Sequence, residues 1–103
     1  MDIKTLSLPK LNRLEPTLES TTLKLMEEAG ELARVIGKYR SMSGEKIYVD
    51  EKTIVSEIAR ELLDVAQTAV TMMFVMEEEF GIDIEDLLRD HLEKLENKGY
   101  LVR

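Results

Sequence analysis

The chain has 103 residues, a formal charge of −7 and no cysteine, and these three facts exclude several classes of protein. A length near 100 residues fits a single domain, 1–103, because two smaller units would not each bury an adequate core. The excess of 21 acidic over 14 basic side chains argues against nucleic acid as a partner. Without cysteine there is no disulfide framework and no thiolate metal site. No signal core or membrane-spanning run is found, so we expect a cytoplasmic protein with no membrane partner.

The first fifteen residues contain four leucines, and Pro9 is compatible with the first turn of a helix. Pro16 then interrupts the segment, because proline lacks an amide hydrogen and disfavours the helical conformation of the residue before it. We therefore predict a short N-terminal helix that ends before Pro16.

Three longer segments have the 3–4 residue apolar spacing of amphipathic helices. The first runs from Thr17 to about Tyr39 and is followed by a predicted loop, Ser41–Asp50. Asp50 is a suitable N-cap for the second helix, which should end near Phe80, where Gly81 supplies a left-handed residue. The third helix should span about 83–97, from its Asp cap to a stop at Gly99.

No segment alternates with a period of two for long enough to form a sheet. The fold class is therefore all-α, and three main helices plus the short N-terminal helix predict a small helical bundle.

The second main helix has apolar residues around most of its circumference. Between Leu62 and Met76, the only non-apolar residues are Asp64, Gln67, Thr68 and Thr71. Such a helix could lie at the centre of the bundle. We favour the alternative that it also lines a subunit interface of a homodimer or homotetramer, because a chain of this size offers few internal partners.

Two acidic pairs lie beside the apolar faces, namely Glu28 with Glu31 and Glu61 with Asp64. Acidic pairs three residues apart occur by chance about this often in so acidic a chain. We therefore used the position of each pair around its helix to judge whether the pairs could meet. At about 100° per residue, each pair lies roughly 60° and 120° from the centre of its apolar face, on the same side. If the two helices pack face to face, these carboxylates converge.

Converging carboxylates repel one another, and a bound divalent cation is the natural compensation. Oxygen ligands at this spacing suit Mg²⁺ or Mn²⁺. Glu57 extends the acidic stripe, whereas Glu27 points outward. The alternative is a solvated helix border that pairs with Lys24, Arg34 or Arg60.

The last predicted helix has a basic border formed by His91, Lys94 and Lys98. We predict that Lys94 and Lys98 contact substrate phosphates, from a neighbouring subunit if the chain is oligomeric. The alternative is ordinary surface lysines near a helix C-terminus, where they complement the helix dipole. Lys24, Glu57 and His91 complete the candidate substrate contacts.

Two stretches of the sequence resemble the MazG-like family. They are KLMEEAGELARVIGKYR, residues 24–40, and EIARELLDVAQTAVTMM, residues 57–73. The family signature is E-E-x-x-E on one helix and E-x-x-D on a later one, matched here by residues 27–31 and 61–64. The resemblance extends over roughly 18–100. The interval between the motifs is slightly longer than in most members, and the extra length falls in the predicted loop.

This resemblance implies a Mg²⁺-dependent enzyme that hydrolyses nucleoside triphosphates to the monophosphate and pyrophosphate, in a house-cleaning role. It implies Glu28, Glu31, Glu61 and Asp64 as metal ligands, with Mn²⁺ as a substitute ion. The catalytic candidates are Glu27, Glu28 and Glu61, since a carboxylate near the metal can accept a proton from the attacking water.

Three alternatives remain open at this stage. Two are enzymes of the same fold, a dUTP/dCTP-specific pyrophosphatase and a phosphoribosyl-ATP pyrophosphohydrolase. The third is a non-catalytic helical dimer that binds nucleotides or another protein through the same acidic groove.

Overall fold

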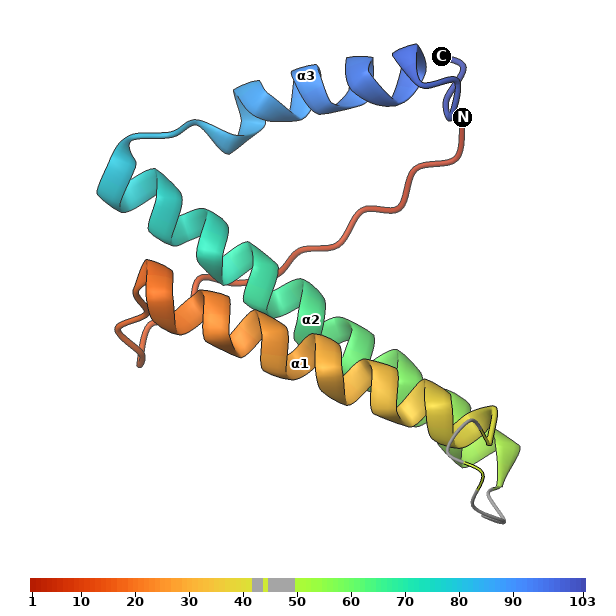
Figure 1. Ribbon diagram of the computed structural model, residues 1–103. Coiled ribbons are helices and arrows are strands. Elements are labelled where there is room, and N and C mark those ends of the chain that lie inside the picture. Colours follow the sequence, from red (N-terminus) through yellow and green to blue (C-terminus); the bar gives the residue numbers. More distant parts are fainter. Residues whose placement is uncertain (42–43, 45–49) are drawn as a thin grey trace.

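The computed structural model describes residues 1–41, 44 and 50–103, and within them it contains three α-helices and no strand (Figure 1). Helix α1 spans Leu18–Tyr39, α2 spans Glu51–Phe80 and α3 spans Ile84–Asn97. The all-α class and the three main helices are thus confirmed. Most of the predicted loop Ser41–Asp50 lies outside the described residues. None of these helices combines the length and hydropathy needed to cross a bilayer.

The helix ends follow from local side-chain chemistry. The Thr17 hydroxyl accepts the backbone N–H of Ser20 at 3.0 Å, and the Ser20 hydroxyl accepts the N–H of Thr17 at 2.8 Å, so α1 begins with a capping box. Asp50 and Asp83 cap the next two helices by accepting backbone N–H groups. Gly81 has φ 66° and ends α2 in the left-handed conformation. The predicted ends of these helices are confirmed.

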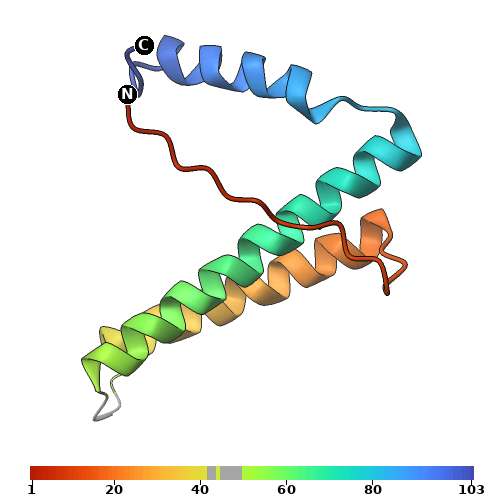
Figure 2. The same ribbon diagram turned by 180° about the vertical axis from the view of Figure 1, so that it is seen from behind.

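The predicted short N-terminal helix is wrong, because residues 1–17 contain no helical residue. They run in an extended conformation from near the C-terminus across α2 to the start of α1 (Figure 2). With Pro9 at its start and Pro16 at its end, a helix here would have only about two turns, and so short a helix is marginal without tertiary packing. The carbonyl of Pro9 instead accepts from the Gln67 side chain at 2.9 Å, and Lys10 forms an ion pair with Glu78. Contacts with α2 therefore replace local helix formation.

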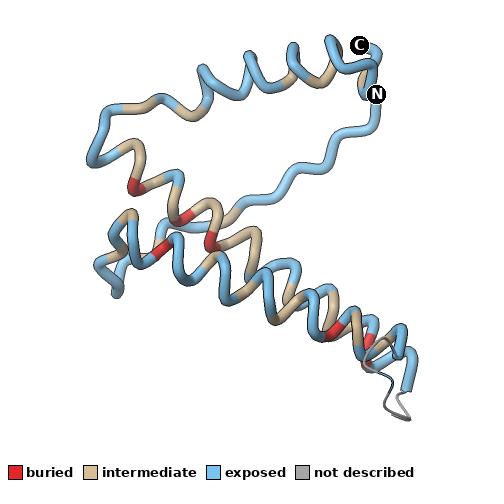
Figure 3. Tube along the Cα trace, viewed as in Figure 1, coloured by how far each residue is buried: buried red, intermediate tan, exposed pale blue. Residues whose placement is uncertain are grey.

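Helices α1 and α2 pack against each other as an antiparallel pair. On each helix, the residues of the contact seam recur seven residues apart, as in a coiled coil. They are Thr21, Glu28 and Val35 on α1, and Ile54, Glu61 and Thr68 on α2. Buried residues gather toward the two ends of this pair (Figure 3). The middle of the seam is left to the carboxylates of Glu28 and Glu61.

The predicted small helical bundle is not completed within one chain, because α3 stands apart from the α1–α2 pair (Figure 1). The Cα radius of gyration is 17.0 Å, whereas a compact chain of this length would have about 13 Å. Helix α3 has no buried residue, and its Leu87 and Leu88 are exposed. Leu62 and Leu63 of α2 are exposed as well. One chain thus leaves much of its apolar surface uncovered.

Val35 and Val102 offer a matched test of the packing, since they are 3% and 90% exposed respectively. The Val35→Ala change removes apolar contact from the end of the seam and should lower the free energy of unfolding by about 2 kcal/mol. Val102→Ala makes the same chemical change in solvent and should leave stability within about 0.5 kcal/mol of wild type. Urea denaturation measures both. Equal effects of the two substitutions would contradict the packing of α1 on α2.

Candidate metal centre

Three carboxylates from α1 and α2 come together at the middle of the seam. Oxygen atoms of Glu28, Glu61 and Asp64 all lie within 4.8 Å of one another. The Glu28 side chain is only 12% exposed, and Glu61 is half-buried. Glu61 Oε2 is enclosed and has no hydrogen-bond partner among the described residues. A buried carboxylate oxygen without a partner is costly, so this arrangement requires a compensating group.

The raised pKa of Glu61 also indicates that the cluster requires a compensating group. Burial raises the pKa of its carboxyl group above the ordinary value of 4.5, and the charges of Glu28 and Asp64 raise it further. Glu31 adds a smaller contribution of the same sign. Without a bound cation, the fold therefore disfavours the ionised form of Glu61.

Lys24 is the cation that pairs with this cluster in the described part of the chain. Its Nζ lies 3.1 Å from Glu28 and 3.6 Å from Glu27, and the hydrogen bond to Glu28 raises the pKa of Lys24. The Glu27 side chain is 62% exposed, in line with its predicted outward direction. Lys24 thus neutralises the Glu28 edge of the cluster and leaves Glu61 without a partner.

Glu31 and Glu57 do not belong to the group of three. Glu31 accepts from Arg34 Nη2 at 3.2 Å, so two ion pairs of the alternative are present, this one at the surface and the Lys24–Glu28 pair at the edge of the cluster. Glu57 is half-buried one turn before Glu61. Their predicted roles in metal and substrate binding stay predictions.

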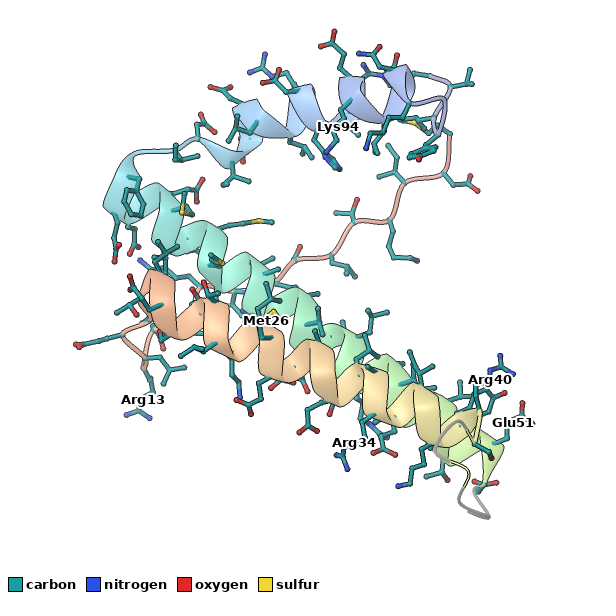
Figure 4. All side chains as sticks on the ribbon, viewed as in Figure 1. Arg13, Met26, Arg34, Arg40, Glu51 and Lys94 are labelled. Atoms are coloured by element: carbon teal, nitrogen blue, oxygen red, sulfur yellow. The ribbon has the colours of Figure 1, made fainter. Side chains whose placement is uncertain are left out.

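The basic residues predicted to contact substrate lie on or just after α3. His91 and Lys94 are exposed, and Lys98 Nζ lies 6.0 Å from the centre of the Tyr100 ring. Figure 4 shows Lys94 on α3, away from the α1–α2 pair that holds the acidic cluster. One chain therefore does not bring these residues to the carboxylates. Their predicted contribution from a neighbouring subunit stays a prediction.

A cavity of about 420 Å³ adjoins the cluster. Two of its lining residues, Glu28 and Asp64, belong to the cluster itself, and Lys24 lies at the same wall. The N-terminal segment contributes Leu11, Leu14, Glu15 and Pro16 to the wall that faces the helices. The cavity thus has an acidic end and an apolar side, and its size suits a small organic molecule.

Sequence reasoning missed this cavity, although a signal for it was present. Gln67, Thr68 and Thr71 interrupt the apolar stretch of α2, and together with Asp64 they follow the 3–4 residue spacing of one helix face. All four line the cavity. The contribution of residues in the 11–16 segment to the cavity wall was not predicted, because this segment was expected to form a helix of its own.

From the helical angles we predicted that the acidic pairs lie beside the apolar faces. In the structure, Glu28 and Glu61 lie on the contact seam itself. The angles were measured from Leu25 and Ile58 as face centres, whereas the seam residues of both helices lie about 60° to one side of these centres. The apolar faces also include outward residues, since Ile36 is 39% exposed and Leu62 is 56% exposed.

The family model for the MazG nucleotide pyrophosphohydrolase domain matches residues 16–99 of this chain. The chain belongs to the MazG family. No curated protein and no solved structure matched it in the corresponding comparisons. Membership confirms the resemblance found in the sequence and indicates a hydrolase that acts on nucleotides.

The acidic cluster of this MazG domain fits a hard divalent cation. Its donors are carboxylate oxygens only, which Mg²⁺ and Mn²⁺ prefer over nitrogen or sulfur. The unpartnered Oε2 of Glu61 is an available ligand atom, and both helices supply donors to the same point.

Replacing Glu61 tests the repulsion directly in the metal-free protein. Because folding raises the pKa of Glu61, the ionised group destabilises the fold above that pKa, and the effect disappears as pH falls toward 4.5. Glu61→Gln should therefore raise the melting temperature at pH 7 in EDTA, with a smaller gain at pH 4.

The exposed Glu93 provides the matched control, since Glu93→Gln should leave the melting temperature nearly unchanged at both pH values. A lower melting temperature for metal-free Glu61→Gln at pH 7 would show that Glu61 stabilises the fold instead.

Proposed function

We propose that this chain is a Mg²⁺-dependent nucleoside triphosphate pyrophosphohydrolase of the house-cleaning type. It would hydrolyse the bond between the α and β phosphates of an NTP or dNTP and release a nucleoside monophosphate and pyrophosphate. The observation that best supports this proposal is the convergence of Glu28, Glu61 and Asp64 beside a cavity of nucleotide size. These residues come from the two acidic motifs that lie within the family match.

Glu28, Glu61 and Asp64 are the proposed metal ligands. Glu31 would complete the set by turning from Arg34 toward the cluster, one helical turn from Glu28. When bound, a divalent ion neutralises phosphate charge and polarises the phosphorus under attack.

A carboxylate of the cluster is the proposed acceptor for the proton that leaves the attacking water. Of the three catalytic candidates, Glu28 and Glu61 belong to the converging group, whereas the exposed Glu27 pairs with Lys24. We therefore assign proton acceptance to Glu28 or Glu61 and a positioning role to Glu27, which holds the Lys24 ammonium group.

The cavity would bind the rest of the nucleotide. With the phosphates at the acidic end, the sugar and base would extend along the apolar side, against Leu11 and Leu14. Lys24 lies where it could pass from Glu28 to a phosphate oxygen. Lys94 and Lys98 would reach the phosphates only from a second copy of the chain.

We also propose that the active form is a homodimer or homotetramer. The radius of gyration of 17.0 Å and the exposed Leu62, Leu63, Leu87 and Leu88 leave apolar faces that a second copy would cover. Interface residues at the α2 surface would include methionines such as the exposed Met73, whose flexible side chain adapts to a partner.

The activity is tested by pyrophosphate release from each NTP and dNTP and from phosphoribosyl-ATP, with Mg²⁺ and with EDTA. Asp64→Asn should lower kcat/KM by more than about a hundredfold, because it removes a charged metal ligand. Asp90→Asn makes the same change on exposed α3 and should keep wild-type turnover. Full activity of Asp64→Asn would place the metal elsewhere, and absence of turnover with every substrate would favour a binding protein.

The assembly is tested by light scattering coupled to gel filtration. We expect a mass that is a multiple of 11.8 kDa, and Leu62→Glu should shift it toward the monomer by charging the exposed face of α2. Thr5→Glu adds the same charge in the extended N-terminal segment and should not change the mass. A wild-type mass of 11.8 kDa would contradict the oligomer.

A further inference from the structure

Gln67 lies between the N-terminal segment and the cavity beside the acidic cluster. Its side-chain Nε2 donates to the carbonyl of Pro9 at 2.9 Å and to Thr71 Oγ1 at 3.3 Å. It also lines the cavity, where residues of the 11–16 segment form the facing wall. One side chain therefore holds the wall in place and borders the space that it encloses.

The hydrogen bond to Pro9 fixes the orientation of the Gln67 amide. Pro9 offers only a carbonyl oxygen at this point, so the group that faces it must be the NH₂ of the amide. The second hydrogen of that NH₂ goes to Thr71. What Gln67 can still offer to a ligand is its carbonyl oxygen Oε1, which is an acceptor.

Several other polar groups of the cavity have no hydrogen left to donate to a ligand. The hydroxyls of Ser20, Thr21 and Thr68 each donate to a backbone carbonyl three or four residues earlier, at 3.3, 2.8 and 2.9 Å. Glu28 and Asp64 are acceptors when ionised. Apart from the Lys24 ammonium group, which pairs with Glu27 and Glu28, and the Thr71 hydroxyl, the polar lining presents acceptors, and a ligand that donates hydrogen bonds complements these.

We propose that Gln67 is a specificity-determining residue, whose Oε1 accepts a hydrogen bond from the exocyclic amino group of the nucleobase. This inference rests on the proposed function and on the base lying in this cavity. Cytosine and adenine bear such an amino group at the ring position compared here, whereas guanine carries an oxygen there and its amino group at another position. Uracil, thymine and hypoxanthine carry an oxygen at the same position, which would oppose Oε1 as a second acceptor and leave both without a donor.

Two substrate pairs isolate the amino group from the size of the base. These are dCTP against dUTP, and dATP against dITP, each of which exchanges an amino for an oxo group. The wild-type protein should favour the amino member of each pair by about tenfold in kcat/KM. Gln67→Met keeps the length of the side chain without its oxygen and should bring both ratios to about one.

Glu78→Gln is the matched control, because it weakens the Lys10 ion pair that holds the same segment but lies outside this cavity. It should leave both ratios unchanged. If Glu78→Gln lowered the amino-to-oxo ratios of kcat/KM as far as Gln67→Met does, the position of the segment, and not Oε1, would set the preference.

Calorimetric titration with α,β-imido analogues of dCTP and dUTP separates this inference from the proposed function. Tighter binding of the dCTP analogue to wild type, lost in Gln67→Met, supports the role of Gln67 even if no triphosphate is hydrolysed. Equal binding of the two analogues, or a wild-type preference for the oxo base, overturns it even if hydrolysis is rapid.

Discussion

Repulsion among the carboxylates in the middle of the α1–α2 seam is the constraint that the rest of the fold accommodates. Glu28 and Glu61 take seam positions that apolar residues would fill in an ordinary helix pair. The helices are held together on either side, where Val35 and Ile54 pack at one end and Val75 at the other. The raised pKa of Glu61 and the absence of a partner for its Oε2 both result from this placement. The middle of the α1–α2 pair therefore lacks apolar packing and contains a site with uncompensated negative charge.

A seam with acidic residues at its centre leaves little core for so small a chain. Only three apolar residues among those described are buried, each still 3% exposed, and α3 adds none. The extended shape and the exposed leucines of α2 and α3 follow from the same shortage. A second copy of the chain would supply apolar contacts that one chain lacks. The same association would allow α3 of one copy to make the proposed phosphate contacts at the site of the other.

The N-terminal segment turns the surface beside the carboxylates into a cavity. Because Pro9 and Pro16 limit any helix between them to about two turns, contacts with α2 prevail and the segment lies extended across that helix. Its attachment through Gln67 and Glu78 brings Leu11 and Leu14 opposite the polar face of α2. The proposed metal site is thus formed by the helix pair alone, whereas the proposed nucleoside site also needs a segment distant in sequence.

The sequence by itself determined the three helices, the caps at Asp50 and Asp83, the stop at Gly81 and membership of the MazG family. These features depend on hydrogen bonds and φ preferences within a few residues, or on motifs that lie within one helix. Tertiary structure decided which carboxylates meet, because the true seam follows the seven-residue repeat and the apolar faces include outward residues such as Leu62. It also decided the course of residues 1–17 and the separation of α3, since these depend on which distant surface offers a partner.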